Sequence, residues 1–186
     1  MKRNIKADFL NSIENDNWMI EILKIVRDLN LNDCWIGAGF VRNKIWDEEH
    51  KITRTKLNDI DVIYFDQLHN IKKFDIAIEN KLKKNYPKLN WSVKNQARMH
   101  VRNNHQEYAN CKEAISFWPE TATAIAVRLN KNDKIEYIAP YGLNDLYNLI
   151  VKPTPKFNLT TYKNRLAKKQ WKEKWSKLII EGFELH

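Results

Sequence analysis

The segment LNDIDVIYF at residues 57–65 decides how this chain can fold. Its β-branched and aromatic residues are typical of a strand, and it carries two aspartates, Asp59 and Asp61. Because successive side chains of a strand point to opposite faces, both carboxylates share one face while Ile60 and Val62 share the other. Two like charges this close repel each other, and a divalent cation between them would remove the repulsion. Since hard oxygen ligands suit such ions, the pattern predicts a site for Mg²⁺ or Mn²⁺.

A second informative segment, CWIGAGFVRN at residues 34–43, lies just upstream. Its apolar start, its glycines and its apolar continuation predict a strand, a tight turn and a helix. Gly37 and Gly39 would let the backbone approach a ligand, and the helix N-terminus after them favours anions such as phosphate. The segment is not a P-loop, since no Gly-Lys-Ser/Thr follows, and it lacks the third glycine of the dinucleotide-binding fingerprint.

A glycine turn followed by an Asp-x-Asp strand resembles the nucleotidyltransferase superfamily of the polymerase-β type. Further strings, in matching order, are similar to those of a bacterial nucleotidyltransferase-like family of unknown function, and the resemblance covers about residues 17–170. The resemblance implies an α/β (α+β) domain with a small mixed sheet flanked by helices. The further strings are KNQARMH at 94–100, WPETATA at 118–124 and APYGL at 139–143.

For the two aspartates, the resemblance implies a catalytic role. Nucleotidyl transfer requires metal ions that bridge the attacking and leaving oxygens, and donors that hold the triphosphate. Asp59 and Asp61 would bind Mg²⁺ or Mn²⁺ and help to position an NTP, whose nucleoside monophosphate passes to an unidentified hydroxyl or amine. The alternative is an exposed aspartate pair on an edge strand.

The glycine turn is predicted to hold the nucleotide. Gly37 and Gly39, with the amides at the start of the helix, would cradle the β- and γ-phosphates, although a purely structural turn gives the same pattern. Arg42 or Asn43, in the first turn of that helix, could reach a phosphate. Arg42 could equally pair with a surface carboxylate.

The chain lacks the third acid that active superfamily members place on a neighbouring strand. The corresponding strand here carries Ser92, Lys94 and Asn95. Glu136, in a predicted hairpin, is the nearest substitute and a weak one. A catalytically weak or inactive nucleotide- or RNA-binding module on the same fold is therefore the alternative function.

Four further positions, Asn95, Arg98, His100 and Glu120, are predicted as possible substrate contacts. Asn95, Arg98 and His100 follow the third strand, and if the segment stays extended Arg98 and His100 share one face. They could bind a base, a phosphate or an acidic acceptor, although His100 could equally be a hydrogen-bonded structural residue. Glu120, in the string at 118–124, could shape the pocket rim near the metal.

The C-terminal part of the chain is strongly basic. We expect a nucleotidyltransferase-like domain at residues 1–152 and a basic helical extension at 153–186, packed on the same domain. Within the extension, Trp171 and Trp175 are predicted to dock on the core rather than stack on bases. Its lysines could form a solvated face or contact an RNA acceptor.

Composition limits the partners. The 186 residues carry a formal net charge of +9, which favours polyanionic or nucleotide partners. Apolar runs reach only about five residues, so no membrane span is predicted, and no apolar stretch follows the charged start, so a cytoplasmic protein is expected. The acceptor could be RNA, protein or a small molecule. A toxin–antitoxin component or another interaction domain is a third possibility.

The periodicity of apolar residues predicts the individual elements. Residues 47–58 form a charged loop, either a mobile segment that grips substrate or a solvated surface loop. Helices are predicted at 16–29, 40–47, 70–84, 112–117, 143–151 and 160–178, and strands at 34–36, 57–65, 89–93, 124–129 and 134–138.

Overall fold

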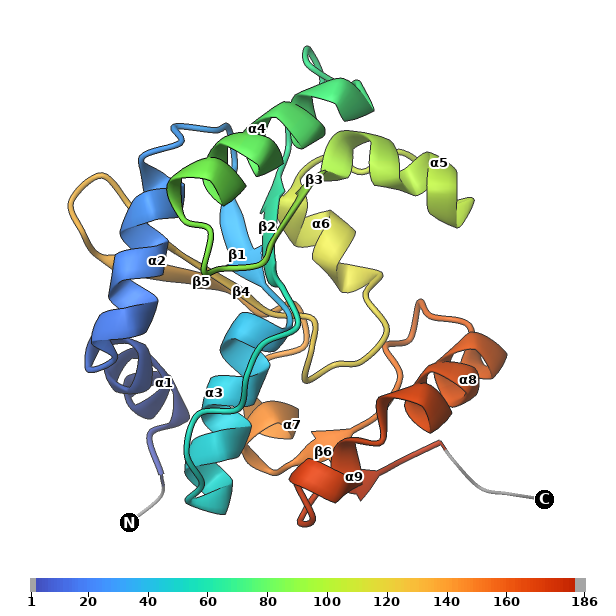
Figure 1. Ribbon diagram of the computed structural model, residues 1–186. Helices are drawn as coiled ribbons and strands as arrows, with labels where there is room; N and C mark the ends of the chain where they lie inside the picture. The colour runs from blue at the N-terminus through green and yellow to red at the C-terminus, as the bar shows by residue number, and fades with distance from the viewer. Residues whose placement is uncertain (1–2, 183–186) are drawn as a thin grey trace.

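A five-stranded mixed sheet forms the centre of the computed structural model, which describes residues 3–182 (Figure 1). The strand order is β3-β2-β1-β4-β5, with β2 and β3 parallel and the other neighbours antiparallel. This mixed sheet with flanking helices confirms the predicted fold class. The strands are β1 (Trp35–Gly37), β2 (Ile60–Tyr64), β3 (Trp91–Asn95), β4 (Ala126–Leu129) and β5 (Ile135–Ile138).

Helices cover both faces of the sheet (Figure 1). On one face, alternate strand residues such as Ile36 and Val62 join the larger hydrophobic core with the N-terminal helices. On the other face, Trp35 and Ile63 pack against Cys111 and Ile115 of a short helix. The larger core receives α1 (Ile5–Glu14), α2 (Asn17–Arg27), α3 (Gly39–His50) and α4 (Lys72–Asn85), and the smaller one α6 (Cys111–Ser116).

The segment after β3 does not stay extended. The chain turns at once into a 3₁₀ turn, η1 (Gln96–Arg98), and then a short helix, α5 (Met99–Asn103). The side chain of Asn95 causes this turn, because its Oδ1 accepts a hydrogen bond from the amide of Ala97 at 3.0 Å. Arg98 and His100 therefore do not share the face of an extended strand.

The predicted single terminal helix is also wrong. It is split into α8 (Leu159–Lys169) and α9 (Trp171–Lys174) at Gln170, whose φ of 47° ends the first helix. Trp171 and Trp175 pack edge-on against Trp46 of α3, with ring centroids 5.4 and 5.1 Å apart. Both indoles are buried, which confirms that they dock on the core.

The helix predicted at 143–151 is shorter in the structure. Only α7 (Asn144–Tyr147) is helical, and residues 150–151 form a short strand, β6 (Ile150–Val151). This strand pairs in parallel with β7 (Ile179–Ile180), so tertiary pairing with a segment far along the chain overrides the local helical pattern. No helix in the described part of the chain is long and apolar enough to cross a membrane.

Candidate active site

An open cavity of about 130 Å³ lies where the turn after β1 meets the start of β2. It brings together most of the residues predicted to bind metal and phosphate, and it adds basic and aromatic residues from the C-terminal helices. Its lining consists of Ala38, Gly39, Arg42, Asn43, Lys56, Leu57, Asn58, Asp59, Asp61, Arg165, Lys169, Trp171, Lys174 and Trp175.

Sheet register brings the glycine turn to the aspartates. In the antiparallel pair β1–β2, Gly37 lies opposite Asp61. On the other side of β2, the parallel strand β3 places Ser92 beside Asp61. Asp59 precedes the strand by one residue and lines the same cavity. The two carboxylates therefore face the turn, as the strand alternation predicted.

The cavity raises the pKa of Asp61 to about 6. Burial is the main cause and the neighbouring charge of Asp59 adds to it, while Ser92 and nearby cations act in the opposite direction. Neither aspartate forms an ion pair with any residue between 3 and 182. Both carboxylates therefore lack a direct ion-pair partner in the described chain and are available to a cation.

These two carboxylates fit a magnesium ion that also binds substrate. Mg²⁺ is commonly held by one or two carboxylates together with waters and substrate phosphates, so a full cage of protein ligands is not needed. Within the described residues, no group of three or more His, Cys, Asp or Glu side chains could hold a metal. Asp59 and Asp61 are suited to an ion whose remaining ligands are waters or phosphate oxygens.

The backbone strain in the turn falls on Ala38 and not on either glycine. Ala38 has φ 53° and ψ −121°, a conformation that residues with a Cβ rarely adopt. Gly37 is needed for close packing instead, because a Cβ there would lie 2.6 Å from the Trp118 ring. At Gly39 a Cβ would make only ordinary contacts. No side chain caps the first turn of α3; the amides of Val41 and Arg42 donate to the Ala38 carbonyl, which leaves those of Gly39 and Phe40 for a ligand.

Arg42 is almost fully buried against this turn, with 7% of its surface exposed. Its Nη1 donates to Thr123 Oγ1 at 3.1 Å and its Nη2 donates to Asn43 Oδ1 at 2.7 Å. The guanidinium also lies over the Trp171 ring, 4.5 Å from its centroid. Burial lowers the pKa of Arg42 to about 10, and Nε has no hydrogen-bond partner among the described residues. The alternative of a surface ion pair for Arg42 is wrong.

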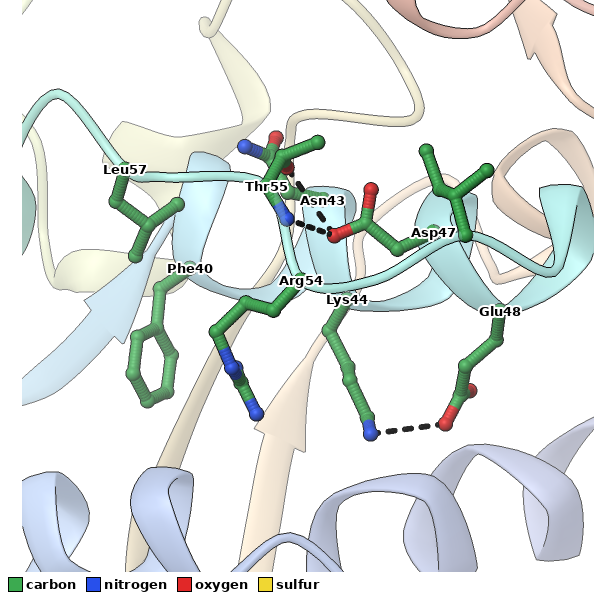
Figure 2. Close-up of a pocket in the computed structure, with 9 residues that line it drawn as sticks. Phe40, Asn43, Lys44, Asp47, Glu48, Arg54, Thr55 and Leu57 are labelled. Carbon is green, nitrogen blue, oxygen red and sulfur yellow. Dashed lines mark hydrogen bonds and ion pairs between the residues drawn. The ribbon is translucent and has the colours of Figure 1, made fainter.

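The helix α3 runs on to His50, so the charged loop begins at residue 51, and it is held against α3 (Figure 2). Asp47 Oδ2 accepts hydrogen bonds from the Thr55 amide at 2.8 Å and the Thr55 hydroxyl at 3.1 Å. Its other oxygen, Oδ1, accepts from Trp175 Nε1 at 2.9 Å. One buried carboxylate of α3 thus fixes both the loop that leads to Asp59 and the C-terminal segment across the cavity.

Glu120 does not lie at the rim of the cavity. Its side chain is fully buried behind Arg165, whose Nε donates to Glu120 Oε1 at 2.5 Å. The other carboxylate oxygen has no hydrogen-bond partner in the described structure. Glu120 therefore acts on the cavity through Arg165, which does line it.

Asn95, Arg98 and His100 lie away from this cavity. Asn95 is at the opposite end of β3 from Ser92, is fully buried, and donates to the Asp66 carbonyl at 2.7 Å. Arg98 forms a close ion pair with buried Asp75, and the His100 ring packs edge-on against Tyr108. The structure does not bring these three residues to the aspartates.

The weak candidate for a third acid, Glu136, is also distant. It lies on the edge strand β5 and pairs with Arg128 at 2.7 Å and with Asn130 at 3.0 Å. The residue beside Asp61 on β3 is Ser92, and Lys94 follows it on the same face. The cavity has no third carboxylate among its lining residues.

Sequence reasoning missed the basic residues that the C-terminal helices bring to the cavity. Arg165 and Lys169 are four residues apart on α8, and Lys174 lies on α9. The i, i+4 spacing showed that Arg165 and Lys169 share a helix face. The direction of that face depends on the docking of Trp171 and Trp175, which the pattern alone does not specify.

Comparison with known families agrees with the site geometry. Residues 24–180 match a family model described as nucleotidyltransferase, and the chain belongs to this nucleotidyltransferase family. No curated protein matches the chain by sequence.

Solved structures give a consistent result. A protein whose NMR structure is described as revealing a CCA-adding enzyme head domain is 38% identical, with a TM-score of 0.85, and the match covers 94% of this chain and 95% of that chain. A CCA-adding enzyme in complex with CTP is 16% identical, with a TM-score of 0.58 over 97% of this chain and 44% of that chain. The Thermotoga maritima CCA-adding enzyme complexed with tRNA is 15% identical, with a TM-score of 0.57 over 97% and 43%. The last two show a shared fold only, and this chain spans less than half of their length.

Proposed function

We propose that this chain transfers a nucleoside monophosphate from an NTP to an acceptor hydroxyl or amine in a Mg²⁺-dependent reaction. The observation that carries the proposal is the meeting of two unpaired carboxylates, Asp59 and Asp61, with an uncapped helix start and buried Arg42 in one cavity. Membership of a nucleotidyltransferase family supports the reaction class.

The proposed chemistry is a displacement at the α-phosphorus. The acceptor oxygen or nitrogen forms a bond to this phosphorus, the bond to the bridging oxygen breaks, and pyrophosphate leaves with the electron pair. A bound Mg²⁺ supplies positive charge at the phosphate oxygens. Asp59 and Asp61 hold it, while the amides at the start of α3 and Arg42 bind phosphate oxygens. The acceptor proton passes to solvent water, since Asp59 and Asp61 are engaged by the metal and the neighbouring position on β3 holds Ser92, which is not a base.

Label transfer tests the proposal. The full chain is incubated with each α-³²P-labelled NTP, Mg²⁺ and candidate acceptors of three kinds, namely RNA, proteins and small molecules. We expect label on one acceptor class, lost in chelator and in the double variant Asp59→Ala, Asp61→Ala. Asp8→Ala with Asp28→Ala removes two acids that do not line the cavity and serves as the control. Transfer that survives loss of both cavity aspartates would refute the proposal.

A non-catalytic nucleotide- or RNA-binding module is the second candidate. It is favoured by one observation, the serine in place of an acid beside Asp61. This candidate predicts Mg²⁺-dependent ATP binding that requires Asp59 and Asp61 but no label transfer to any acceptor. RNA affinity that falls steeply with salt would favour an RNA-binding module.

A further inference from the structure

The cavity contains more positive than negative side chains. Two carboxylates line it, and a single divalent ion would balance them. The cations would then remain without a counter-charge in the lining. They are Arg42, Lys56, Arg165, Lys169 and Lys174, and three of the five come from the C-terminal helices α8 and α9.

Two of these cations are held in place from behind. Arg165 is anchored by fully buried Glu120 through its Nε, which leaves the terminal nitrogens of the guanidinium for other partners. Arg42 is anchored by Thr123 and Asn43, while its Nε is buried without a partner in the described part of the chain. A buried, unpartnered donor is costly and indicates a missing acceptor.

The positive charges also crowd each other. Lys169 is exposed, but partial desolvation lowers its pKa, and the charges of Arg165 and Arg42 lower it further. Like charges gathered on two separate parts of the chain, α3 and α8, oppose the docking of these parts. A bound anion would relieve this repulsion.

We propose that Arg165 and Lys169 of α8, with Lys174 of α9 and Arg42 of α3, form a subsite for the β- and γ-phosphates of the nucleotide. This inference rests on the proposed function and adds to it: the C-terminal segment, not only the glycine turn, binds the triphosphate. A linear triphosphate presents several adjacent charges, which matches cations that approach from two sides of one small cavity.

The C-terminal segment is anchored firmly enough to hold such a ligand. Trp171 and Trp175 pack against Trp46, and Trp175 also donates a hydrogen bond to Asp47. Both indoles are buried in these contacts, and the cations Arg165, Lys169 and Lys174 of α8 and α9 line the cavity beside them. The segment therefore completes the nucleotide site within a single chain.

Binding of inorganic triphosphate tests this subsite without requiring catalysis. The dissociation constant for inorganic triphosphate with Mg²⁺ is measured by calorimetry on the full chain. We expect the double variant Lys169→Ala, Lys174→Ala to bind about 100-fold more weakly, since each lost charge-assisted hydrogen bond costs roughly tenfold. Both lysines are exposed, so these substitutions leave the core intact.

The matched control is Lys168→Ala with Lys172→Ala, which removes the same charge from the same two helices outside the cavity lining. We expect this control to bind within about twofold of the parent chain. Equal weakening in the two double variants would overturn the subsite, because it would indicate general electrostatic attraction. Binding of single-stranded RNA without binding of triphosphate would also overturn it.

Arg165 requires a variant that spares the fold, because its loss would leave Glu120 buried and unpaired. Arg165→Gln combined with Glu120→Gln keeps a neutral hydrogen-bonded pair and removes the cation. We expect about tenfold weaker triphosphate binding with a similar melting temperature, and unchanged binding would overturn the role of Arg165. If the variants weaken triphosphate binding as expected but no label transfer is found, the subsite is supported and the proposed transferase activity is refuted. If label transfer is found but the variants bind triphosphate normally, the transferase activity is supported and the subsite is refuted.

Discussion

Charged side chains at the two ends of the parallel strand pair β2–β3 have different partners. The near end lies at the cavity, where β2 begins, and the far end is where β3 ends. At the far end, Asp75 is 3% exposed and accepts hydrogen bonds from Tyr64 Oη at 2.8 Å and the Asn95 amide at 3.2 Å, in addition to its ion pair with Arg98. At the near end, Asp59 and Asp61 face an open cavity with no ion pair in the described chain.

The difference separates charge that stabilises the fold from charge that is available to a ligand. A buried carboxylate with three protein partners has its hydrogen-bonding capacity largely used within the protein, so it stabilises the fold. A carboxylate pair that repels itself destabilises the fold until a cation binds. We therefore interpret the far end as structural and the near end as functional, although acids and arginines gather at both ends of the same strand pair.

The largest expected effect concerns activity at the near end. Asp59→Ala with Asp61→Ala should reduce nucleotidyl transfer by about 1000-fold or more, because loss of the metal removes several kcal/mol of transition-state stabilisation. Thermal unfolding of the same variant should show little loss of stability, because neither carboxylate has an ion-pair partner in the described chain. A large drop in melting temperature would break the comparison, because it would give these acids a structural role.

The next effect concerns stability at the far end. Asp75→Ala should destabilise the fold by about 3–5 kcal/mol, because it leaves the Arg98 guanidinium without its ion-pair partner in a partly buried site. Denaturant unfolding measures this difference. The control is Asp28→Ala, whose carboxylate pairs with Arg27 at the surface and should contribute less than about 1 kcal/mol. A cost for Asp75→Ala as small as that of the control would contradict the structural interpretation.

Stability measured as a function of pH tests the charge of Asp61 at the near end. The pKa of Asp61 is raised to about 6, so the folded chain binds a proton there more tightly than the unfolded chain does. Stability therefore falls as the pH rises from about 4 to about 6, and the penalty is present in full above that range. Without divalent metal, Asp61→Asn should exceed the parent chain in stability by up to about 3 kcal/mol at pH 8. The gain should shrink toward pH 4, and a gain independent of pH would argue against a charge effect.

The smallest expected effect concerns the strained turn. Ala38→Gly should stabilise the fold by about 1 kcal/mol, because glycine adopts positive φ without the Cβ clash, partly offset by the greater freedom of the unfolded chain. Gly37→Ala should instead destabilise by about 1–3 kcal/mol, since the new methyl group meets the Trp118 ring. Denaturant midpoints of the two variants should shift in opposite directions.

Local patterns predicted the near end well. Alternation along residues 57–65 placed both aspartates toward one cavity, and the glycine-containing segment formed the predicted strand, turn and helix. These features depend on steric preferences of neighbouring residues, which a sequence shows directly. Even there, the structural roles of the turn residues were not those predicted. The strained backbone conformation lies at Ala38, and Gly37 is required because a Cβ would meet the ring of Trp118, far along the chain.

Patterns failed where a partner far along the chain decides the outcome. Arg98 was predicted to contact substrate from one face of an extended segment after the third strand, but that segment turns and α4 presents Asp75 to it. Glu120 was predicted at the rim, but α8 covers it with Arg165. The helix predicted at 143–151 ends early because β7 pairs with β6. Each outcome depends on packing between distant segments.

The amino-acid sequence alone determined a mixed α/β fold, a pair of carboxylates on one strand face and a turn suited to an anion, because backbone sterics and side-chain alternation act over a few residues. Only the tertiary structure decided which charges remain available. It neutralises Asp75 with Arg98 and leaves Asp59 and Asp61 facing cations from α8 and α9. The physical reason is that the indoles of Trp171 and Trp175 dock on Trp46, and this long-range burial of apolar surface directs Arg165 and Lys169 into the cavity.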